Sequence, residues 1–257
     1  MLKPRVIPVL LIDEERLVKT KKFSNPLYVG DPINVVKIFN DKECDELILV
    51  DISASKKGAA PNFEYLKEIA SECFMPMTYG GGITSMEQAT TIFKLGFEKI
   101  CLNSSLYKNP NLVCDLVNKF GSQSIVASLD IKNDWRGKAR PYDYAKKNFL
   151  NFTVEEVIEY VKNLRVGELL LNFVDKDGLM KGSDPKIIKI ISSCLDIPVV
   201  GLGGVSSLED IALILQSGAS AAAAGSFFVY YGPLKAVLIS YLDKSQFDHL
   251  TKKLTIQ

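Results

Sequence analysis

Residues 75–87 read MPMTYGGGITSME, and residues 197–209 read IPVVGLGGVSSLE. Each stretch is a short apolar run, a glycine turn and the start of an amphipathic segment, which is typical of a strand followed by a helix. The two stretches are 122 residues apart, and the same separation relates Glu46 to Glu168 and Asn103-Ser104 to Gly225-Ser226. One separation shared by three strand positions predicts a duplicated chain, with halves at approximately residues 1–122 and 123–257.

The strand-then-helix unit recurs along the whole chain. Eight continuous apolar runs, rich in Val, Ile and Leu, are typical of strands buried on both faces. They lie at Arg5–Ile12, Glu46–Asp51, Met75–Tyr79, Glu98–Asn103, Ser124–Asp130, Glu168–Phe173, Ile197–Leu202 and Ala219–Ala224. Eight units in 257 residues predict one α/β domain over residues 1–257, a (β/α)8 barrel. A duplication of four units favours the closed barrel over an open, doubly wound sheet.

Helix starts can be read from capping residues. Asp31-Pro32 places a cap residue before a first-turn proline. The capping-box pattern of a hydroxyl residue followed three positions later by Glu is present at Thr84–Glu87, Thr153–Glu156 and Ser206–Glu209. A helix is therefore expected to begin at each of these four places.

Composition excludes several classes of function. The net charge is +1 and 47% of the residues are apolar, so neither nucleic acid nor an anionic membrane is an expected partner. No apolar run reaches the roughly 18 residues of a membrane span, and the N-terminus does not read as a signal peptide. We expect a cytoplasmic protein.

Cysteine and histidine usage argues against metal, redox and histidine-based catalysis. The five cysteines are scattered without a CxxC pair and read as buried, reduced thiols: Cys44, Cys73, Cys101, Cys114 and Cys194. The single histidine, His249, lies outside every motif. We therefore predict no metal site and no cofactor.

Glycine turns after equivalent strands predict two phosphate sites at the carboxyl-terminal mouth of the barrel. Glycine lets backbone N–H groups approach a phosphate, and barrels commonly bind phosphate after strands seven and eight. One set is Gly203-Gly204 with Gly225-Ser226, and the other is Gly81-Gly82 with Asn103-Ser104. Two sets on opposite sides of one mouth suggest an elongated substrate with a phosphate at each end.

Charged residues at strand ends supply the candidates for catalysis and binding. Asp130 ends an apolar run whose burial could raise its pKa, so we predict a general acid or base there. Asp51 and Asp177 also follow strands, and each is either a substrate ligand or a helix-cap or turn aspartate. Asp175 reads better as a turn residue. Lys19, after strand one, either binds phosphate, orders a loop or is solvated.

Four charges lie at the opposite end of the barrel, at or near the starts of strands one, two, four and six. They are Arg5, Glu46, Lys99 and Glu168. Such residues cannot touch a substrate at the mouth. They are either separate, solvated residues or a ring of alternating charge that closes the bottom of the barrel, and periodicity leaves both interpretations open.

These residues together resemble HisF, the cyclase subunit of imidazole glycerol phosphate synthase, over nearly the whole chain. The segments that carry the resemblance, in order, are Arg5-Val6-Ile7-Pro8, Gly30-Asp31-Pro32, Asp45-Glu46-Leu47, Asp51-Ile52-Ser53-Ala54-Ser55, Gly80-Gly81-Gly82-Ile83, Phe120-Gly121-Ser122-Gln123, Asp175-Lys176-Asp177-Gly178 and Gly203-Gly204. The isomerase family HisA is a weaker match, because the four bottom charges are those of HisF.

The resemblance implies a glutaminase partner and an ammonia route. HisF proteins pair with a glutaminase subunit, HisH, whose ammonia enters the barrel bottom through a charged gate and reaches the mouth. There it attacks a bis-phosphorylated ribulosyl aminoimidazole carboxamide. The family's gate positions fall on Arg5, Glu46, Lys99 and Glu168, and a catalytic aspartate falls on Asp130. Lys19, Asp51, Asp177 and Gly178 are then expected among the substrate ligands, together with the two glycine sets.

The chain departs from HisF at two places. The family's second catalytic aspartate closes strand one, where Leu11 stands here, and Asp13 could replace it only through a register shift of two residues or a bulge. The strand-five loop, residues 138–152, lacks the family's His-Gly-Gly signature and is rich in aromatic residues. This pattern resembles HisF paralogues that are encoded with surface-polysaccharide genes. Those paralogues imply an alternative in which the barrel conducts ammonia to an amidotransferase that forms acetamidino groups on sugars.

Overall fold

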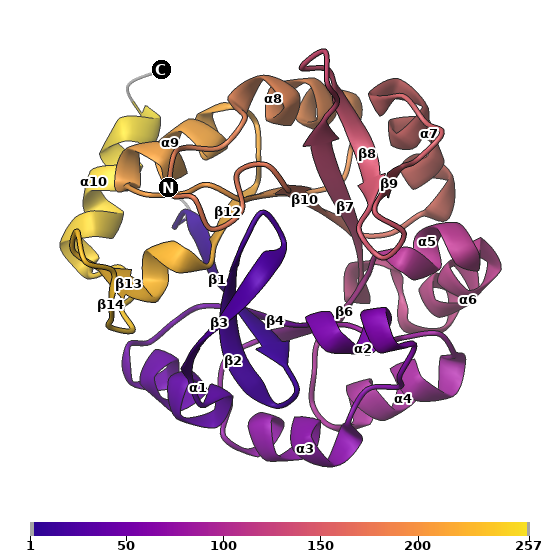
Figure 1. Ribbon diagram of the computed structural model, residues 1–257, viewed down its shortest axis with the longest axis horizontal. Coiled ribbons are helices and arrows are strands. Elements are labelled where there is room, and N and C mark those ends of the chain that lie inside the picture. Colours follow the sequence, from indigo (N-terminus) through magenta and orange to yellow (C-terminus); the bar gives the residue numbers. More distant parts are fainter. Residues whose placement is uncertain (1–2, 256–257) are drawn as a thin grey trace.

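The computed structural model describes residues 3–255, and its centre is a closed ring of eight parallel strands (Figure 1). The ring consists of β1 (Arg5–Asp13), β4 (Leu47–Asp51), β5 (Met77–Gly80), β6 (Lys99–Leu102), β7 (Ile125–Asn133), β10 (Glu168–Phe173), β11 (Val199–Leu202) and β12 (Ala221–Ala224). It closes because β1 pairs with both β4 and β12, while β10 pairs with both β7 and β11. The predicted (β/α)8 barrel is confirmed.

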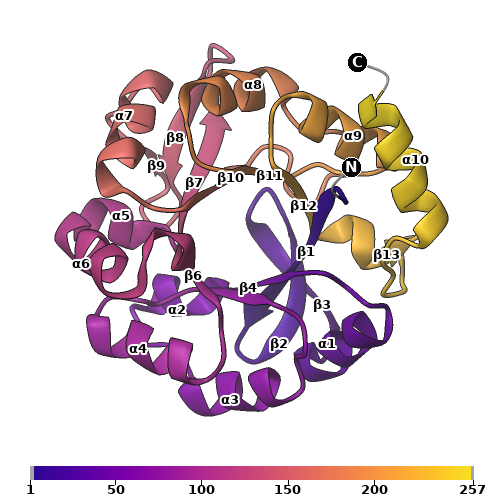
Figure 2. The ribbon, with the colours of Figure 1, turned by 180° about the vertical axis from the view of Figure 1, so that it is seen from behind.

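Helices cover the outside of the ring, as the view from the opposite end also shows (Figure 2). They are α1 (Pro32–Asp41), α2 (Ile52–Lys57), α3 (Phe63–Ser71), α4 (Met86–Lys94), α5 (Ser104–Lys108), α6 (Pro110–Phe120), α7 (Val154–Leu164), α8 (Pro185–Cys194), α9 (Leu208–Gln216) and α10 (Lys244–Thr255), with short 3₁₀ turns η1 (Ser122–Ser124) and η2 (Ser226–Phe228). Among residues 3–255, no helix is both long and apolar enough to cross a membrane.

Several strands begin later than the apolar runs predict. β5 and β11 start after Pro76 and Pro198, because proline has no N–H to donate to the ladder. The carbonyls of both prolines still accept bonds, from Leu47 N at 3.0 Å and Leu169 N at 2.9 Å. β7 ends later than predicted, at Asn133 rather than at Asp130.

At two of the three predicted capping boxes, the residue that caps the helix is the next one along the chain. The box at Thr153 is confirmed, with Glu156 as its third helical residue. The helix α4 is capped instead by Ser85 with Gln88, and α9 is capped by Ser207, whose side chain accepts from Asp210 N. Adjacent hydroxyl residues fit the sequence pattern in either register, and only the position of the first turn selects between them. Asp31 caps α1 as expected.

Three hairpins that the sequence did not reveal follow the carboxyl ends of β1, β7 and β12 (Figure 1). They consist of β2 (Arg16–Lys21) with β3 (Ser24–Gly30), β8 (Ala139–Asp143) with β9 (Asn148–Phe149), and β13 (Tyr230–Tyr231) with β14 (Ala236–Val237). β8 also pairs with the extended end of β7. These strands are short, rich in polar residues or, in β3, largely exposed, so they lack the long apolar runs by which the barrel strands were found.

The barrel has two hydrophobic cores. The larger one lies between the strands and the helices. The smaller one fills the barrel interior and consists of Ile7, Val9, Ile48, Cys101, Val126, Leu170, Val200, Ala221 and Ala223. Strands that bury both faces need apolar residues at every position, which explains the continuous runs. The cysteines are free, but only Cys44 and Cys101 are buried and Cys194 is exposed, so the expectation of five buried thiols was wrong.

Candidate functional site

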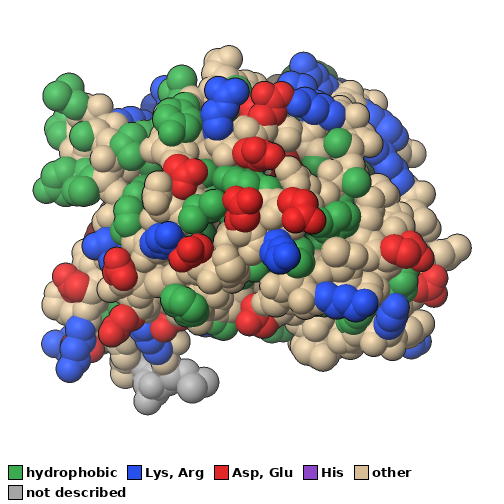
Figure 3. All heavy atoms as spheres, turned by 90° about the horizontal axis from the view of Figure 1, so that it is seen from below, with side chains coloured by type: hydrophobic (Ala, Val, Ile, Leu, Met, Phe, Trp, Pro, Cys, Tyr) green, Lys and Arg blue, Asp and Glu red, His purple; other side chains and the backbone are tan. Residues whose placement is uncertain are grey.

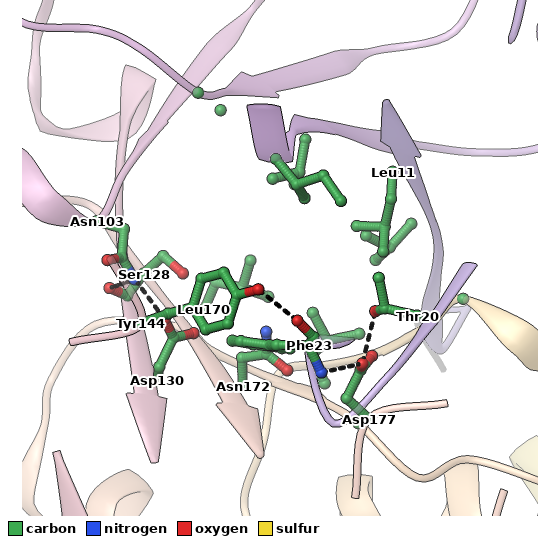
Figure 4. Close-up of a pocket in the computed structure, with 18 of the residues that line it drawn as sticks. Leu11, Thr20, Phe23, Asn103, Ser128, Asp130, Tyr144, Leu170, Asn172 and Asp177 are labelled. Carbon is green, nitrogen blue, oxygen red and sulfur yellow. Dashed lines mark hydrogen bonds between the residues drawn. The ribbon is translucent and has the colours of Figure 1, made fainter. Parts of the chain in front are cut away.

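A cavity of about 410 Å³ opens at the carboxyl ends of the barrel strands (Figure 4). Its walls include every candidate ligand predicted at the mouth: Lys19, Asp51, Gly81, Gly82, Asn103, Ser104, Asp130, Asp177, Gly178, Gly203, Gly204, Gly225 and Ser226. Residues from both halves of the chain therefore surround one space.

The two predicted glycine turns have the same backbone geometry. Gly81 and Gly82 have φ of 132° and 67°, and Gly203 and Gly204 have φ of 112° and 88°. A Cβ on Gly81 would lie 2.5 Å from the Asp51 carbonyl oxygen, and one on Gly204 would lie 2.1 Å from that of Gly182. Only glycine can hold these turns. Phosphate binding to them, and the duplication, stay predictions.

Lys19 lies in β2 and is buried, so the solvated alternative is wrong. Its Nζ donates to the Val9 carbonyl at 2.7 Å and lies 2.8 Å from where a Cβ on Gly225 would be. Burial lowers the pKa of Lys19 to about 8, and the nearby Asp177 charge opposes this shift. A positive charge thus stands beside the Gly225-Ser226 turn, where an anion would be stabilised.

Asp130 is buried at the base of the cavity, 7% exposed. Asn103 Nδ2 donates to its Oδ2 at 3.1 Å. Burial raises the pKa of Asp130 to about 7, and the charges of Asp177 and Asp143 act in the same direction, against the hydrogen bonds from Asn103 and Asn172. A carboxyl group that titrates near neutral pH can both accept and return a proton, as general acid–base catalysis requires.

Leu11 faces the cavity from the wall opposite Asp130 (Figure 4). β1 pairs with β4 in continuous register from Val9–Ile48 to Ile12–Asp51, without a bulge. Asp13 therefore stays two residues further along the strand, roughly 7 Å beyond Leu11. Asp13 lines the cavity, but the shift that would bring it to the position of Leu11, where the resemblance to HisF implies an acid, has not occurred.

Asp51 and Asp177 line the cavity, and each carboxylate already accepts protein hydrogen bonds. Asp51 caps α2, accepting from Ser53 N at 2.8 Å and Ala54 N at 2.9 Å. Asp177 accepts from Thr20 Oγ1 at 2.7 Å and from Phe23 N at 3.1 Å. Asp175 accepts from Asn133 N at 2.8 Å, in agreement with its reading as a turn residue.

An aromatic contact that sequence reasoning missed crosses the mouth. The Tyr144 hydroxyl donates to the Phe23 carbonyl, and the two rings meet edge to face with centroids 5.2 Å apart (Figure 4). Phe23 belongs to the turn between β2 and β3, and Tyr144 to the β8–β9 loop. The aromatic bias of residues 138–152 was the available signal, but it did not identify the partner. We call this contact, together with Asp177, the mouth strap.

The four charges at the other end of the barrel form a closed ring. Arg5 donates to Glu168 at 2.8 Å and to Glu46 at 2.7 Å. Lys99 Nζ lies 2.8 Å from Glu168 and 3.3 Å from Glu46. Burial opposes ionisation of Glu168, but the hydrogen bonds and charges of Arg5 and Lys99 outweigh it and lower the pKa of Glu168. The structure thus favours the ring over separate, solvated residues, and the small apolar core lies between this ring and the cavity.

The fold and the cavity define a (β/α)8-barrel protein of the common kind whose functional site lies at the carboxyl ends of the strands. Residues 5–235 match the family described as histidine biosynthesis protein. The chain belongs to that family.

Similar proteins carry names from one enzyme. The chain is 44% identical, over 96% of its length and 99% of the other, to the "Putative imidazole glycerol phosphate synthase subunit hisF2" of Pseudomonas aeruginosa. It is 46% identical, over 96% and 95%, to a protein of Vibrio vulnificus named as subunit hisF3 with the same qualifier. It is 35% identical, over 90% and 92%, to the "Imidazole glycerol phosphate synthase subunit HisF" of Alkaliphilus metalliredigens. Of these three, the two numbered subunits are the more similar.

Proposed function

We propose that this protein is the HisF-type subunit of a glutamine-dependent complex of the imidazole glycerol phosphate synthase type. A HisH-like glutaminase docks at the barrel bottom and releases ammonia there. The observation that carries the proposal is the closed ring of Arg5, Glu46, Lys99 and Glu168. Each of the four side chains forms ion pairs with two of the others, and the ring lies where ammonia would enter the barrel.

The barrel interior supports passage of neutral ammonia. Above the ring the side chains are apolar, and three of the nine, Cys101, Ala221 and Ala223, are small. An apolar interior disfavours ammonium strongly, because an unpaired charge loses its hydration there, and disfavours neutral ammonia far less. Lys99, on a flexible stem and held by two contacts, is the side chain that moves to open the ring.

Two acceptors of the ammonia are supported by different observations. The first is the bis-phosphorylated ribulosyl substrate of the cyclase, which the paired glycine turns and the Asp130 pKa near 7 favour. The second is a separate sugar amidotransferase that covers the mouth. Leu11 favours it because this β1 position, opposite Asp130, holds no acid, and Asp13, which also lines the cavity, stays two residues further along β1. Cyclisation by two carboxylates needs that acid, so the geometry supports the second acceptor better.

A cyclase assay separates the two acceptors. The purified protein is given the ribulosyl substrate with concentrated ammonium salt at alkaline pH, so that no glutaminase is needed. No turnover in spite of substrate binding is expected for the conduit. Turnover that Asp130→Asn abolishes would establish the cyclase instead.

The ammonia route itself is tested with the glutaminase present. Lys99→Met breaks the ring, so glutamine-dependent product formation should change several-fold while the reaction with added ammonium salt stays the same. An identical change in both reactions would exclude a gate, because only the glutamine-derived ammonia passes the ring.

A further inference from the structure

The hairpin formed by the end of β7 and by β8 carries an exposed aromatic surface at its tip. Trp135, the single tryptophan of the chain, is 86% exposed there. The Arg136 guanidinium stacks over its ring at 4.4 Å from the centroid. Tryptophan and arginine are the residues that most often dominate binding energy at protein interfaces, and an indole this exposed has no packing role in the barrel.

The tip is held by hydrogen bonds within its turn in spite of its exposure. Asp134 Oδ1 accepts from Arg136 N at 2.8 Å and from Lys138 N at 3.0 Å, and Asp134 N donates to the Lys138 carbonyl at 2.9 Å. Gly137 adopts a φ of 78° in this turn, with open space around it. A preordered turn loses little conformational entropy when it binds a partner, so the cost of binding is lower than for a flexible loop.

The hairpin is basic, and its charges are free to pair with a partner. Lys132, Arg136, Lys138 and Arg140 lie on it, and within residues 3–255 none of the four is in an ion pair. Asp134 is committed to the turn, and the other acid of the hairpin, Asp143 at the end of β8, is buried. Lys132 packs over the ring of Tyr142 and Arg140 over the ring of Phe149. These contacts hold the two side chains in place without neutralising their positive charge. A basic surface around an indole is complementary to an acidic surface around an apolar socket.

A second projecting hairpin lies on another side of the same mouth. Leu234, 95% exposed, sits between β13 and β14, with Tyr231 and Val237 also exposed. Hydrophobic side chains gather on the projection at the left of Figure 3, where Figure 1 places this hairpin. One tip is too small for a stable interface of about 800 Å² per partner, but a protein that contacts both hairpins also covers the cavity between them.

We propose that the Trp135 hairpin docks the enzyme that receives ammonia at the mouth, through an acidic patch on that enzyme. The inference rests on the second acceptor proposed above and names the recognition chemistry of its complex. The net charge of +1 and the confinement of these charges to one hairpin favour a protein partner over a nucleic acid.

Photo-cross-linking tests whether a partner docks at the Trp135 hairpin. A benzoylphenylalanine is placed at position 135 of the full chain, and cross-linking is carried out in cells that produce it. The matched control is position 74, because Phe74 is also 86% exposed but precedes β5 at the opposite end of the barrel. We expect position 135 to capture one protein that position 74 does not, and Arg136→Glu with Lys138→Glu to abolish its capture. Capture of the same proteins from both positions, or of none, would overturn the proposal.

Function is then measured with that purified protein, the chain and its glutaminase. Trp135→Ala should weaken binding on the order of 30-fold. It should also lower glutamine-dependent amidation, while amidation with added ammonium salt is retained. Lys67→Glu, on the exposed outer face of α3, is the charge control and should change neither.

The outcomes separate the docking proposal from the proposed function. If ammonia from glutamine reaches the acceptor and Trp135→Ala changes nothing, the docking proposal alone fails. If the wild-type complex delivers no ammonia to the mouth, the proposed function fails. Binding of a single-stranded oligonucleotide that requires Trp135 would replace the protein partner with a nucleic acid.

Discussion

At Asp130, the chemistry depends on the surroundings more than on the residue. An aspartate has an ordinary pKa of 3.8, and burial beside the mouth raises the pKa of Asp130 to about 7. The folded protein therefore holds a proton there that the unfolded chain releases from about pH 4 upward. Stability that depends on this proton is lost as the pH rises from 4 to 7.

Asp130→Asn should remove that pH dependence. An amide keeps an acceptor for Asn103 and carries no charge to desolvate, so the variant should be more stable than the wild type at pH 8 and equal to it near pH 4. A tenfold change in a protonation equilibrium corresponds to about 1.4 kcal/mol, so the gain in the free energy of unfolding is at most about 4 kcal/mol. Urea unfolding at both pH values measures it. Equal stability of the two proteins at pH 8 would contradict the raised pKa.

Gly178→Ala should be among the most damaging single changes. A Cβ there would lie 1.8 Å from the Thr20 carbonyl oxygen, at a φ of 65°. We expect a loss of about 2 to 4 kcal/mol in the free energy of unfolding, because backbone rather than a flexible side chain blocks the methyl group. Gly137→Ala is the control, since its φ is 78° but no atom is within 4 Å, and it should cost about 1 kcal/mol.

At the scale of elements, the β2–β3 hairpin has two parts: β2 pairs with β1 and buries Leu17 and Val18, while the turn over the mouth is held by the mouth strap. Residues 24–28 of β3 are all exposed, so this strand contributes little to the core. Its turn is fixed instead by Asp177 and Tyr144. A turn and an exposed strand held by a few polar contacts open at a lower free energy than the barrel does.

Tyr144→Phe should loosen that hairpin without unfolding the barrel. The ring contact with Phe23 is kept and the hydrogen bond to its carbonyl is lost, so global stability should fall by only about 1 kcal/mol. Amide hydrogen exchange should become faster over residues 20–25 and stay unchanged in β5. Tyr28→Phe, on the exposed face of β3, is the control and should leave exchange as it is. Unaltered exchange at Phe23 in Tyr144→Phe would show that the strap does not hold the hairpin.

At the scale of the whole molecule, the charged ring joins β1, β6 and β10 to the residue preceding β4. Glu168→Gln leaves Arg5 and Lys99 with Glu46 alone, and a partly buried charge that loses one of its two partners is less well compensated. We expect the free energy of unfolding to fall by about 3 kcal/mol at pH 7. The difference should shrink below about pH 4.5, because the pKa of Glu168 is lowered in the folded protein and protonation of its carboxylate removes the stabilisation. Thermal unfolding across this pH range measures both effects.

The control for the ring is the exposed pair Lys37–Glu72, whose atoms lie 3.3 Å apart. Glu72→Gln makes the same chemical change at the surface and should cost about 0.5 kcal/mol. Equal costs at the two sites would mean that the ring is solvated and contributes no more than a surface pair.

The barrel, its strand order and most of the cavity wall could be predicted because they follow from local patterns. Continuous apolar runs indicate strands that are buried on both faces, and the repeated glycine pairs indicate turns whose backbone conformation only glycine adopts. The hairpins could not be predicted, because β3 is largely exposed and has no long apolar run, and β9 and β13 are two residues long. The contact between Tyr144 and Phe23 joins residues 121 positions apart, which no local pattern encodes.

The sequence by itself determined the fold class and the places of the glycine turns, since each depends on residue types at fixed spacing, and it placed Leu11 where the resemblance to HisF implies an acid. Only the tertiary structure decided that Arg5, Glu46, Lys99 and Glu168 form one ring, that Lys19 is buried beside Gly225, and that Asp130 titrates near neutral pH. Ion pairing and desolvation depend on distances between residues far apart in the chain, and closure of the barrel sets those distances.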